Sequence, residues 1–100
     1  MTNKLLSMIG LSAKAGKVSS GEFAVEKAVK SKAAFLVIVA KDASDNTRKK
    51  FSDMCKYYET PIIFFGTKEE LGKVLGKEYR ASLAISDENF AKGIEEKINS

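Results

Sequence analysis

The acidic side chains that could share general acid and base chemistry stand in two close pairs. Asp42 lies three residues before Asp45, and Asp87 directly precedes Glu88. The chain has no histidine, and Cys55 is its single cysteine. Ser-His and Cys-His catalysis, the usual zinc sites and an internal disulfide are therefore excluded. Helix capping and compensation of the helix dipole explain both acidic pairs, so we predict a protein that is not an enzyme and uses no cofactor and no metal.

A stretch rich in glycine and lysine near the N-terminus has some features of a phosphate loop. Residues 10–17 read GLSAKAGK, with five residues between the two glycines where the loop needs four. Val18 stands where a Ser or Thr must bind Mg²⁺, and no strong strand precedes the stretch. The stretch therefore does not predict nucleotide hydrolysis.

The segment from Lys17 to Gly21 is a candidate anion site. It leads directly into a predicted helix, whose first backbone N–H groups favour a phosphate. Lys14, Lys17 and Lys27 could flank that phosphate, and Phe23 could stack on a base or fill a gap in the packing. An ordinary capped helix start explains the same residues, so both interpretations stay open from the residues alone.

A second candidate site follows the strongest predicted strand, residues 35–40. Lys41 and Asp42 come directly after it, and ligands of α/β sheets bind at the carboxyl ends of strands. A helix cap with solubility charges is the alternative interpretation of this loop. The basic residues 48–50 are consecutive on a predicted helix, so they fan around it and predict a solvated face.

Hydrophobic spacing predicts a regular alternation of helices and strands. Thr67-x-x-Glu70 and Ser19-x-x-Glu22 have the capping-box pattern of helix starts, and Ser44 or Asp45 can cap a further helix. Helices are expected at residues 3–15, 19–31, 45–58, 67–75 and 86–98, and strands at 17–19, 35–40, 61–65 and 81–85. This order predicts an α/β fold, a three-layer α/β/α sandwich with a central four-stranded mixed sheet.

The apolar faces of these elements predict the core. Leu11 shares the predicted apolar face of the first helix, and Phe64, Phe65, Tyr57 and Tyr58 are expected to be mostly buried.

Length and composition predict one domain spanning residues 1–100. The chain has 100 residues, 44% of them hydrophobic and 30% charged, which is typical of a folded globular domain. No apolar run is long enough to cross a bilayer, and the first residues are too polar for a signal peptide. We expect a cytoplasmic monomer with no membrane contact.

Positive charge is concentrated in the first half of the chain. Residues 1–50 hold ten Lys and Arg against four acids, whereas residues 51–100 hold seven against nine. A basic half favours an acidic partner such as RNA, since clustered Lys and Arg attract phosphates. A solvated surface with lysines kept for solubility is the alternative.

Several stretches together resemble the small bacterial members of the 7Ae/30e ribosomal-protein family. In one-letter code they are KAGKVSSGEFAVEKAV, FLVIVAKDASDNT, CKYYETP and LGKVLGKEYRASLAISDENFA, which span nearly all 100 residues in order. The resemblance implies the same α/β/α sandwich and a protein that binds kink-turns in RNA.

The family's kink-turn motif, Gly-x-Asn-Glu-x-x-Lys, reads sheared G·A pairs from the start of the second helix. Gly21 and Lys27 match its glycine and lysine, whereas Phe23 and Ala24 stand at its asparagine and glutamate. The resemblance therefore implies that RNA binding is kept and that kink-turn discrimination is reduced.

Other positions also match the family's RNA contacts. Gly16 and Lys17 match its approach to phosphate, and Lys41 and Asp42 match its strand-end loop. Residues 76–81 match the loop that covers an extruded nucleotide. The predicted RNA-binding residues are Lys14, Gly16, Lys17, Ser20, Gly21, Glu22, Phe23, Lys27, Lys41, Asp42, Lys77, Tyr79 and Arg80, with Lys14, Lys17, Lys27 and Arg80 gripping phosphates.

Two functional hypotheses follow. The first is a non-catalytic protein that binds structured, kink-turn-like RNA in association with the ribosome or translation machinery. Its expected partners are ribosomal RNA and ribosomal or translation-factor proteins. The second is a protein–protein interaction module that kept the fold and lost specific RNA reading.

Overall fold

The computed structural model describes residues 3–99 and centres on a sheet whose strand order is β1-β4-β2-β3. The strands are β1 (Val18–Ser20), β2 (Leu36–Val39), β3 (Ile62–Phe64) and β4 (Ser82–Ile85). β2 runs parallel to β3, and β4 runs antiparallel to both β2 and β1. The two central strands are buried at every position, as expected of strands that helices cover on both faces.

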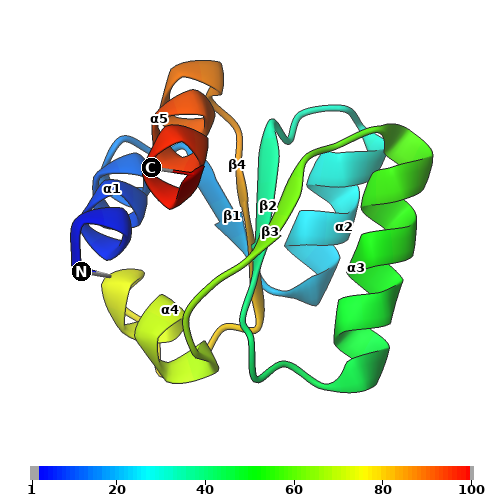
Figure 1. Ribbon diagram of the computed structural model, residues 1–100, viewed down its shortest axis with the longest axis horizontal. Helices are drawn as coiled ribbons and strands as arrows, with labels where there is room; N and C mark the ends of the chain where they lie inside the picture. Colours follow the sequence, from blue (N-terminus) through cyan, green and yellow to red (C-terminus); the bar gives the residue numbers. More distant parts are fainter. Residues whose placement is uncertain (1–2, 100) are drawn as a thin grey trace.

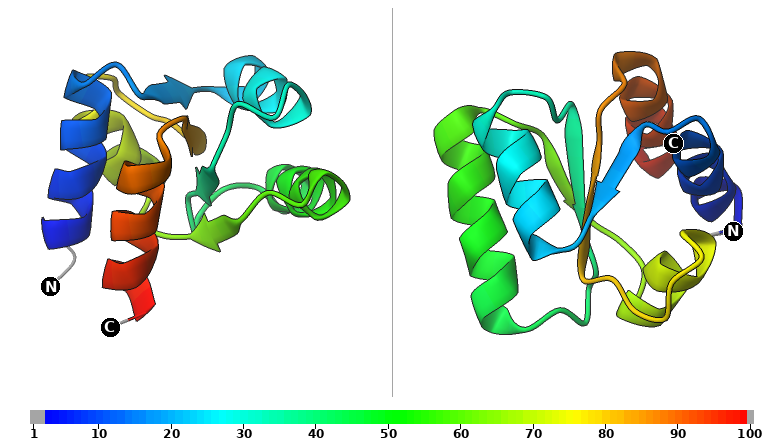
Figure 2. Two further views of the ribbon diagram at one scale, coloured as in Figure 1. Left: turned by 90° about the horizontal axis from the view of Figure 1, so that it is seen from above. Right: turned by 180° about the vertical axis from the view of Figure 1, so that it is seen from behind.

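Helices cover both faces of this sheet. α2 (Glu22–Lys30) and α3 (Asp45–Tyr58) lie on one face, and α1 (Asn3–Lys14), α4 (Lys68–Val74) and α5 (Glu88–Asn99) lie on the other (Figures 1 and 2). The predicted three-layer α/β/α sandwich with a four-stranded mixed sheet is confirmed. None of the helices within residues 3–99 is both long and apolar enough to cross a membrane.

The core lies between the sheet and the inner faces of the helices. Val25 and Val29 of α2 and Phe51 of α3 are fully buried on one side, and Ile9 of α1 and Ile94 of α5 are fully buried on the other. In the same core, burial raises the pKa of the Cys55 thiol to about 11. The thiol is therefore uncharged at neutral pH and packs as a small apolar group.

Local signals start two of the helices as predicted. The Ser44 hydroxyl accepts a hydrogen bond from the backbone N–H of Thr47 at 3.2 Å and caps α3. Thr67 and Glu70 form the complete capping box of α4. The predicted capping box at Ser19 is wrong, because Ser19 pairs with Ala84 in the sheet. Because Ser19 and Ser20 belong to strand β1, α2 begins only at Glu22, with Gly21 as its N-cap residue.

Three residues of the predicted core lie at the surface. Leu11 is 56% exposed, and Tyr57 is 79% exposed. Phe64 is exposed because β3 is an edge strand. Consecutive residues of a helix point about 100° apart, so Tyr58 packs against the core while Tyr57 faces outward. α1 directs Leu5, Ile9 and Ser12 inward instead of Leu11.

Candidate nucleic-acid interface

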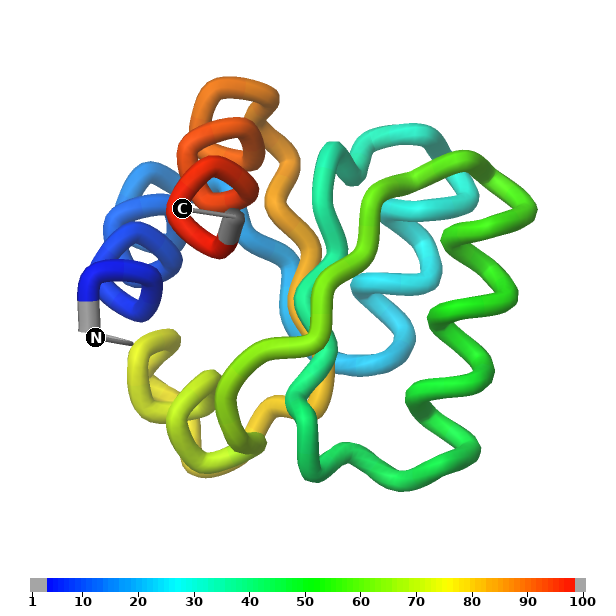
Figure 3. Tube along the Cα trace, viewed as in Figure 1, coloured from blue at the N-terminus to red at the C-terminus, as the bar shows by residue number. Residues whose placement is uncertain are grey.

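Segments far apart in the sequence meet at one end of the sheet, which we call the Gly21 end. β1 finishes there at Ser20, β4 begins there at Ser82 and β2 finishes there at Val39. The Gly21 N–H donates to the Ser82 carbonyl at 3.2 Å. Figure 3 shows the β1–α2 turn, the α4–β4 loop and the β2–α3 connection gathered at the lower end of the trace.

The start of α2 is open to an anion at this end. Gly21 is the N-cap residue, and no side chain caps the helix. Its φ of 96° favours glycine, and a Cβ built there would meet no atom within 4 Å. Within the described residues, no side chain caps the first N–H groups of α2 and no loop carbonyl accepts them, and they lie at the positive end of the helix dipole. Phe23, 85% exposed, and Ala24, also exposed, lie on this first turn.

Arg80 ties the α4–β4 loop to the end of β1. Its Nε donates to the Ser20 Oγ at 3.1 Å, and its Nη1 donates to the Tyr79 carbonyl at 2.8 Å. These bonds fix the guanidinium beside the start of α2 and leave further N–H donors for a ligand. Tyr79, on the same loop, is 59% exposed, and Lys77 is exposed beside it.

The loop after β2 also reaches the Gly21 end. The Lys41 backbone N–H donates to the Gly66 carbonyl at 2.8 Å, and its side chain is exposed. Asp42 Oδ1 accepts the backbone N–H of Lys68 at 2.8 Å. Asp42 therefore holds the start of α4 and keeps only part of its hydrogen-bonding capacity for a ligand.

Lys27 lies further along α2, beside the free edge of β1. Six residues of helix place it roughly 9 Å from Gly21 along the axis. It lines a shallow hollow of about 290 Å³ together with Ser19, Ala24 and Ser31. An extended ligand at the start of α2 can therefore continue along this edge.

Lys14, Gly16 and Lys17 lie at the opposite end of the sheet. Only the short strand β1 separates Lys17 from Gly21, but at ~3.3 Å per residue it places their Cα atoms roughly 13 Å apart. The Lys17 carbonyl accepts the Ser86 N–H at 2.8 Å at that far end. The structure thus separates Lys14 and Lys17 from the anion site that they were predicted to flank, and Gly16 lies with them at the far end.

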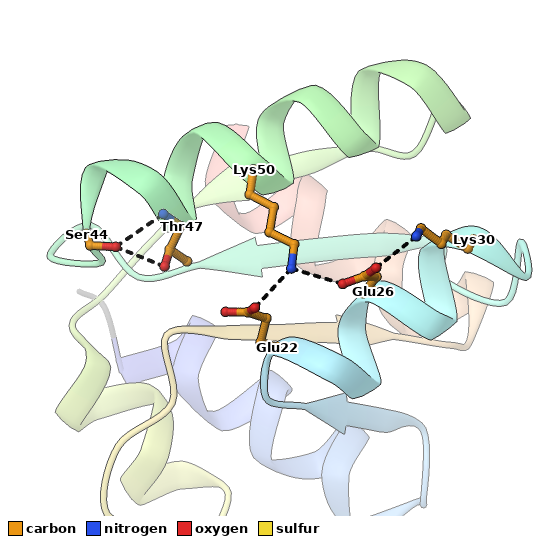
Figure 4. A network of polar contacts seen from close by, with 6 residues as sticks. All are labelled: Glu22, Glu26, Lys30, Ser44, Thr47 and Lys50. Atoms are coloured by element: carbon orange, nitrogen blue, oxygen red, sulfur yellow. Dashed lines mark hydrogen bonds and ion pairs between the residues drawn. The ribbon is translucent and has the colours of Figure 1, made fainter.

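An ion-pair network joins α3 to the start of α2 (Figure 4). Lys50 Nζ lies 2.9 Å from a carboxylate oxygen of Glu22 and 2.9 Å from one of Glu26, which also pairs with Lys30 at 2.8 Å. The predicted solvated face at residues 48–50 is therefore only partly correct, because Lys50 bridges two helices. Glu22, a predicted RNA contact, is occupied by this pair.

The ion pairs of the basic side chains show which predicted RNA contacts keep an unpaired charge. Arg48 pairs with Asp45 and Lys49 with Asp53, so acids match the whole basic run of α3. Within residues 3–99, none of the predicted RNA-binding cations forms an ion pair: Lys14, Lys17, Lys27, Lys41, Lys77 and Arg80. Other lysines of this described part of the chain, such as Lys4, Lys32 and Lys56, are also without an ion pair, so the interface rests on position as well as charge. Of the six predicted cations, all but Lys14 and Lys17 lie at the Gly21 end or along α2.

We expect the network to stabilise the fold in a pH-dependent way. Hydrogen bonds from Lys30 and Lys50 lower the pKa of Glu26 from 4.5 to about 2. A carboxylate with a lowered pKa stabilises the folded state above its unfolded pKa and loses this contribution as the pH falls. The thermal midpoint of Glu26→Gln should be below that of the unaltered protein at pH 7, and the difference should shrink from about pH 4.5 towards pH 2.

Thermal melts across this pH range check the prediction, with Glu78→Gln as a control at an exposed carboxylate that makes no ion pair within the described residues. A pH-independent difference for Glu26→Gln would contradict it.

The fold and this end of the sheet define a small α/β/α domain with an open helix N-terminus and unneutralised cations beside it. A model of the Ribosomal protein L7Ae/L30e/S12e/Gadd45 family matches residues 3–95, and the chain belongs to this family. The resemblance seen in the sequence is confirmed.

Two individual proteins are similar to this chain over most of its length. The chain is 42% identical to "RNA-binding protein YlxQ" of Bacillus subtilis (strain 168) over 84 residues, 84% of each chain. It is 38% identical to "RNA-binding protein YlxQ" of Enterococcus faecium over 95 residues, 95% of this chain and 91% of that protein.

Solved structures share the fold. A protein of unknown function from Bacillus halodurans C superposes with a TM-score of 0.93 at 35% identity, covering 97% of this chain and 98% of that one. The Giardia lamblia 15.5kD RNA binding protein superposes with a TM-score of 0.82 at 24% identity, covering 98% and 87%, and supports the fold alone.

Proposed function

We propose that this protein binds structured RNA without catalysis, through the Gly21 end. The observation that carries this proposal is the uncapped start of α2 beside Arg80, whose guanidinium Ser20 holds in place. An RNA phosphate satisfies the open N–H groups and gains the attraction of both the helix dipole and the guanidinium. The relatives named RNA-binding proteins support the same function.

Exposed aromatic rings flank this phosphate site. Phe23 and Tyr79 offer rings on which unpaired bases can stack, a common mode in RNA recognition. Lys27 and Lys41 extend the positive surface to either side of the helix start. The RNA is therefore a structured one, with its backbone bent around the start of α2 and at least one base unpaired.

The kind of RNA and the neighbouring proteins are inferred from the family resemblance. The RNA is kink-turn-like, in ribosomal RNA or another RNA of the translation machinery, and ribosomal or translation-factor proteins are the expected neighbours. Phe23 and Ala24 lack the polar groups that read sheared G·A pairs, so phosphates and shape contribute more of the affinity than base edges do.

The salt dependence of RNA binding tests the interface. Removing one phosphate contact flattens the slope of log K against log salt by roughly one unit. We expect this change for Arg80→Ala and for Lys27→Ala, and a smaller one for Lys17→Ala at the opposite end. Titrations of a kink-turn RNA over a salt series measure it.

Lys49→Ala is the matched control, because Lys49 is exposed and already paired with Asp53. Equal changes of slope in all four variants would mean diffuse attraction and no defined interface.

A further inference from the structure

A groove between α1 and α4 lies outside the proposed RNA interface. It has a volume of about 550 Å³, and its lining includes Gly10, Leu11, Ala13 and Lys14 of α1 with Val74 and Leu75. Gly10 allows the two helices to approach closely, since a Cβ there would lie 3.2 Å from Val74 Cγ2. The close crossing forms the floor of the groove.

The groove exposes aliphatic surface. Leu11 is 56% exposed, although its spacing in α1 is that of a core residue. Ala13, Val74 and Leu75 are only partly buried along the same groove. A leucine this open, beside further aliphatic side chains in a concave surface, marks a place where another apolar surface can be buried.

The α1 side of the groove carries positive charge. α1 contains no acidic residue. One side of this helix presents Lys4, Leu11 and Lys14, because they are seven and three residues apart. Both lysines are exposed, and neither forms an ion pair within the described residues. A ligand that covers Leu11 therefore meets cations at both ends.

We propose that this groove docks an acidic amphipathic helix of a partner protein. Such a helix presents aliphatic residues at every third and fourth position to Leu11, Val74 and Leu75, and carboxylates to Lys4 and Lys14. A groove between two helices fits a third helix laid along it.

Two other occupants fit the groove less well. RNA offers phosphates and base faces, and bases stack on aromatic rings, of which the lining has none. A second copy of the chain that presents α1 would bring lysine against lysine, because α1 has no acid to pair with them. Lys14, predicted as a phosphate contact, is assigned here to the protein-docking groove.

Fluorescence anisotropy with a designed peptide tests the proposal on the full chain. The probe is a labelled helical peptide with leucines at every third and fourth position and glutamates elsewhere, compared with the same peptide carrying lysines. We expect the glutamate peptide to bind at least about tenfold more tightly. We also expect Leu11→Glu to weaken it by about tenfold or more, and Tyr57→Glu, at an exposed site outside the groove, by less than about twofold.

Amide NMR spectra verify that both variants are folded and locate the bound peptide at α1 and α4. The proposal is overturned if both peptides bind equally or if the shifted amides lie elsewhere. Displacement of the peptide by kink-turn RNA would assign the groove to RNA. A concentration-dependent dimer that Leu11→Glu disrupts would assign it to a second copy. Either result would also overturn the proposal, and the salt dependence of Arg80→Ala and Lys27→Ala tests RNA binding at the Gly21 end separately.

Discussion

The double change Phe23→Asn with Ala24→Glu is expected to raise the preference of this protein for a standard kink-turn over a matched duplex with an unpaired loop. Both positions lie exposed on the first turn of α2, where the family motif reads sheared G·A pairs. Each good polar contact to a base edge contributes ~1–3 kcal/mol of discrimination. Two such contacts correspond to roughly one to several powers of ten in the affinity ratio.

Paired titrations of the two RNAs at one fixed salt concentration measure this ratio. The variant keeps the cations that contact phosphates but loses the Phe23 ring, so its affinity for the duplex with an unpaired loop should stay equal or fall while its preference for the kink-turn rises. Tyr57→Asn is the control, since it replaces an exposed aromatic ring at the distant end of α3. An unaltered protein that already prefers the kink-turn by more than about a thousandfold would show that backbone or loop contacts supply the discrimination.

Most of the fold could be predicted because local signals agree with the tertiary packing. The continuous apolar run around β2 is buried at every position of the strand. Ser44 and Thr67, the predicted caps, start α3 and α4 by the expected hydrogen bonds. At Ser19 a local capping pattern competes with strand pairing to β4, and the sheet hydrogen bonds prevail.

The geometry of the candidate site could be predicted only in part. Family motifs point to Gly21 and Arg80, but the bond between Arg80 and Ser20 joins residues 60 positions apart and has no local pattern. The same holds for Lys50, which reaches Glu22 across 28 positions. Lys17 and Gly21 read as one loop in the sequence, yet a short extended strand places them at opposite ends of the sheet. Spacing predicts the face on which a side chain lies, but not which other segments arrive there.

Gly72→Ala is expected to destabilise the protein and to weaken RNA binding together. Gly72 is buried in α4, and a Cβ built there would lie 2.6 Å from the Glu78 carbonyl oxygen and 2.7 Å from the Tyr79 nitrogen. Alanine is favoured over glycine within a helix by ~1 kcal/mol. Overpacking costs about 1–3 kcal/mol, and the cost is at its upper end here because backbone atoms cannot rotate away. The loop must shift, and with it the exposed ring of Tyr79 and the guanidinium of Arg80 that Ser20 holds.

Gly93→Ala in α5 is the control, because it has the same effect on helix propensity as Gly72→Ala without a clash against backbone atoms. A Cβ at Gly93 would meet only the Met8 Cε at 2.7 Å, the end of a flexible side chain that can move aside. We therefore expect Gly93→Ala to be neutral or to raise the free energy of unfolding by up to about 1 kcal/mol, with RNA affinity unchanged. Gly72→Ala should lower the free energy of unfolding by about 1–2 kcal/mol. Urea denaturation measures the free energy of unfolding of both variants, and RNA titration at fixed salt measures their affinity. If both substitutions raised the free energy of unfolding, or both lowered it, the result would contradict the close contact between α4 and the loop that follows it. A stable Gly72→Ala variant that binds RNA normally would show that the position of this loop does not control the interface.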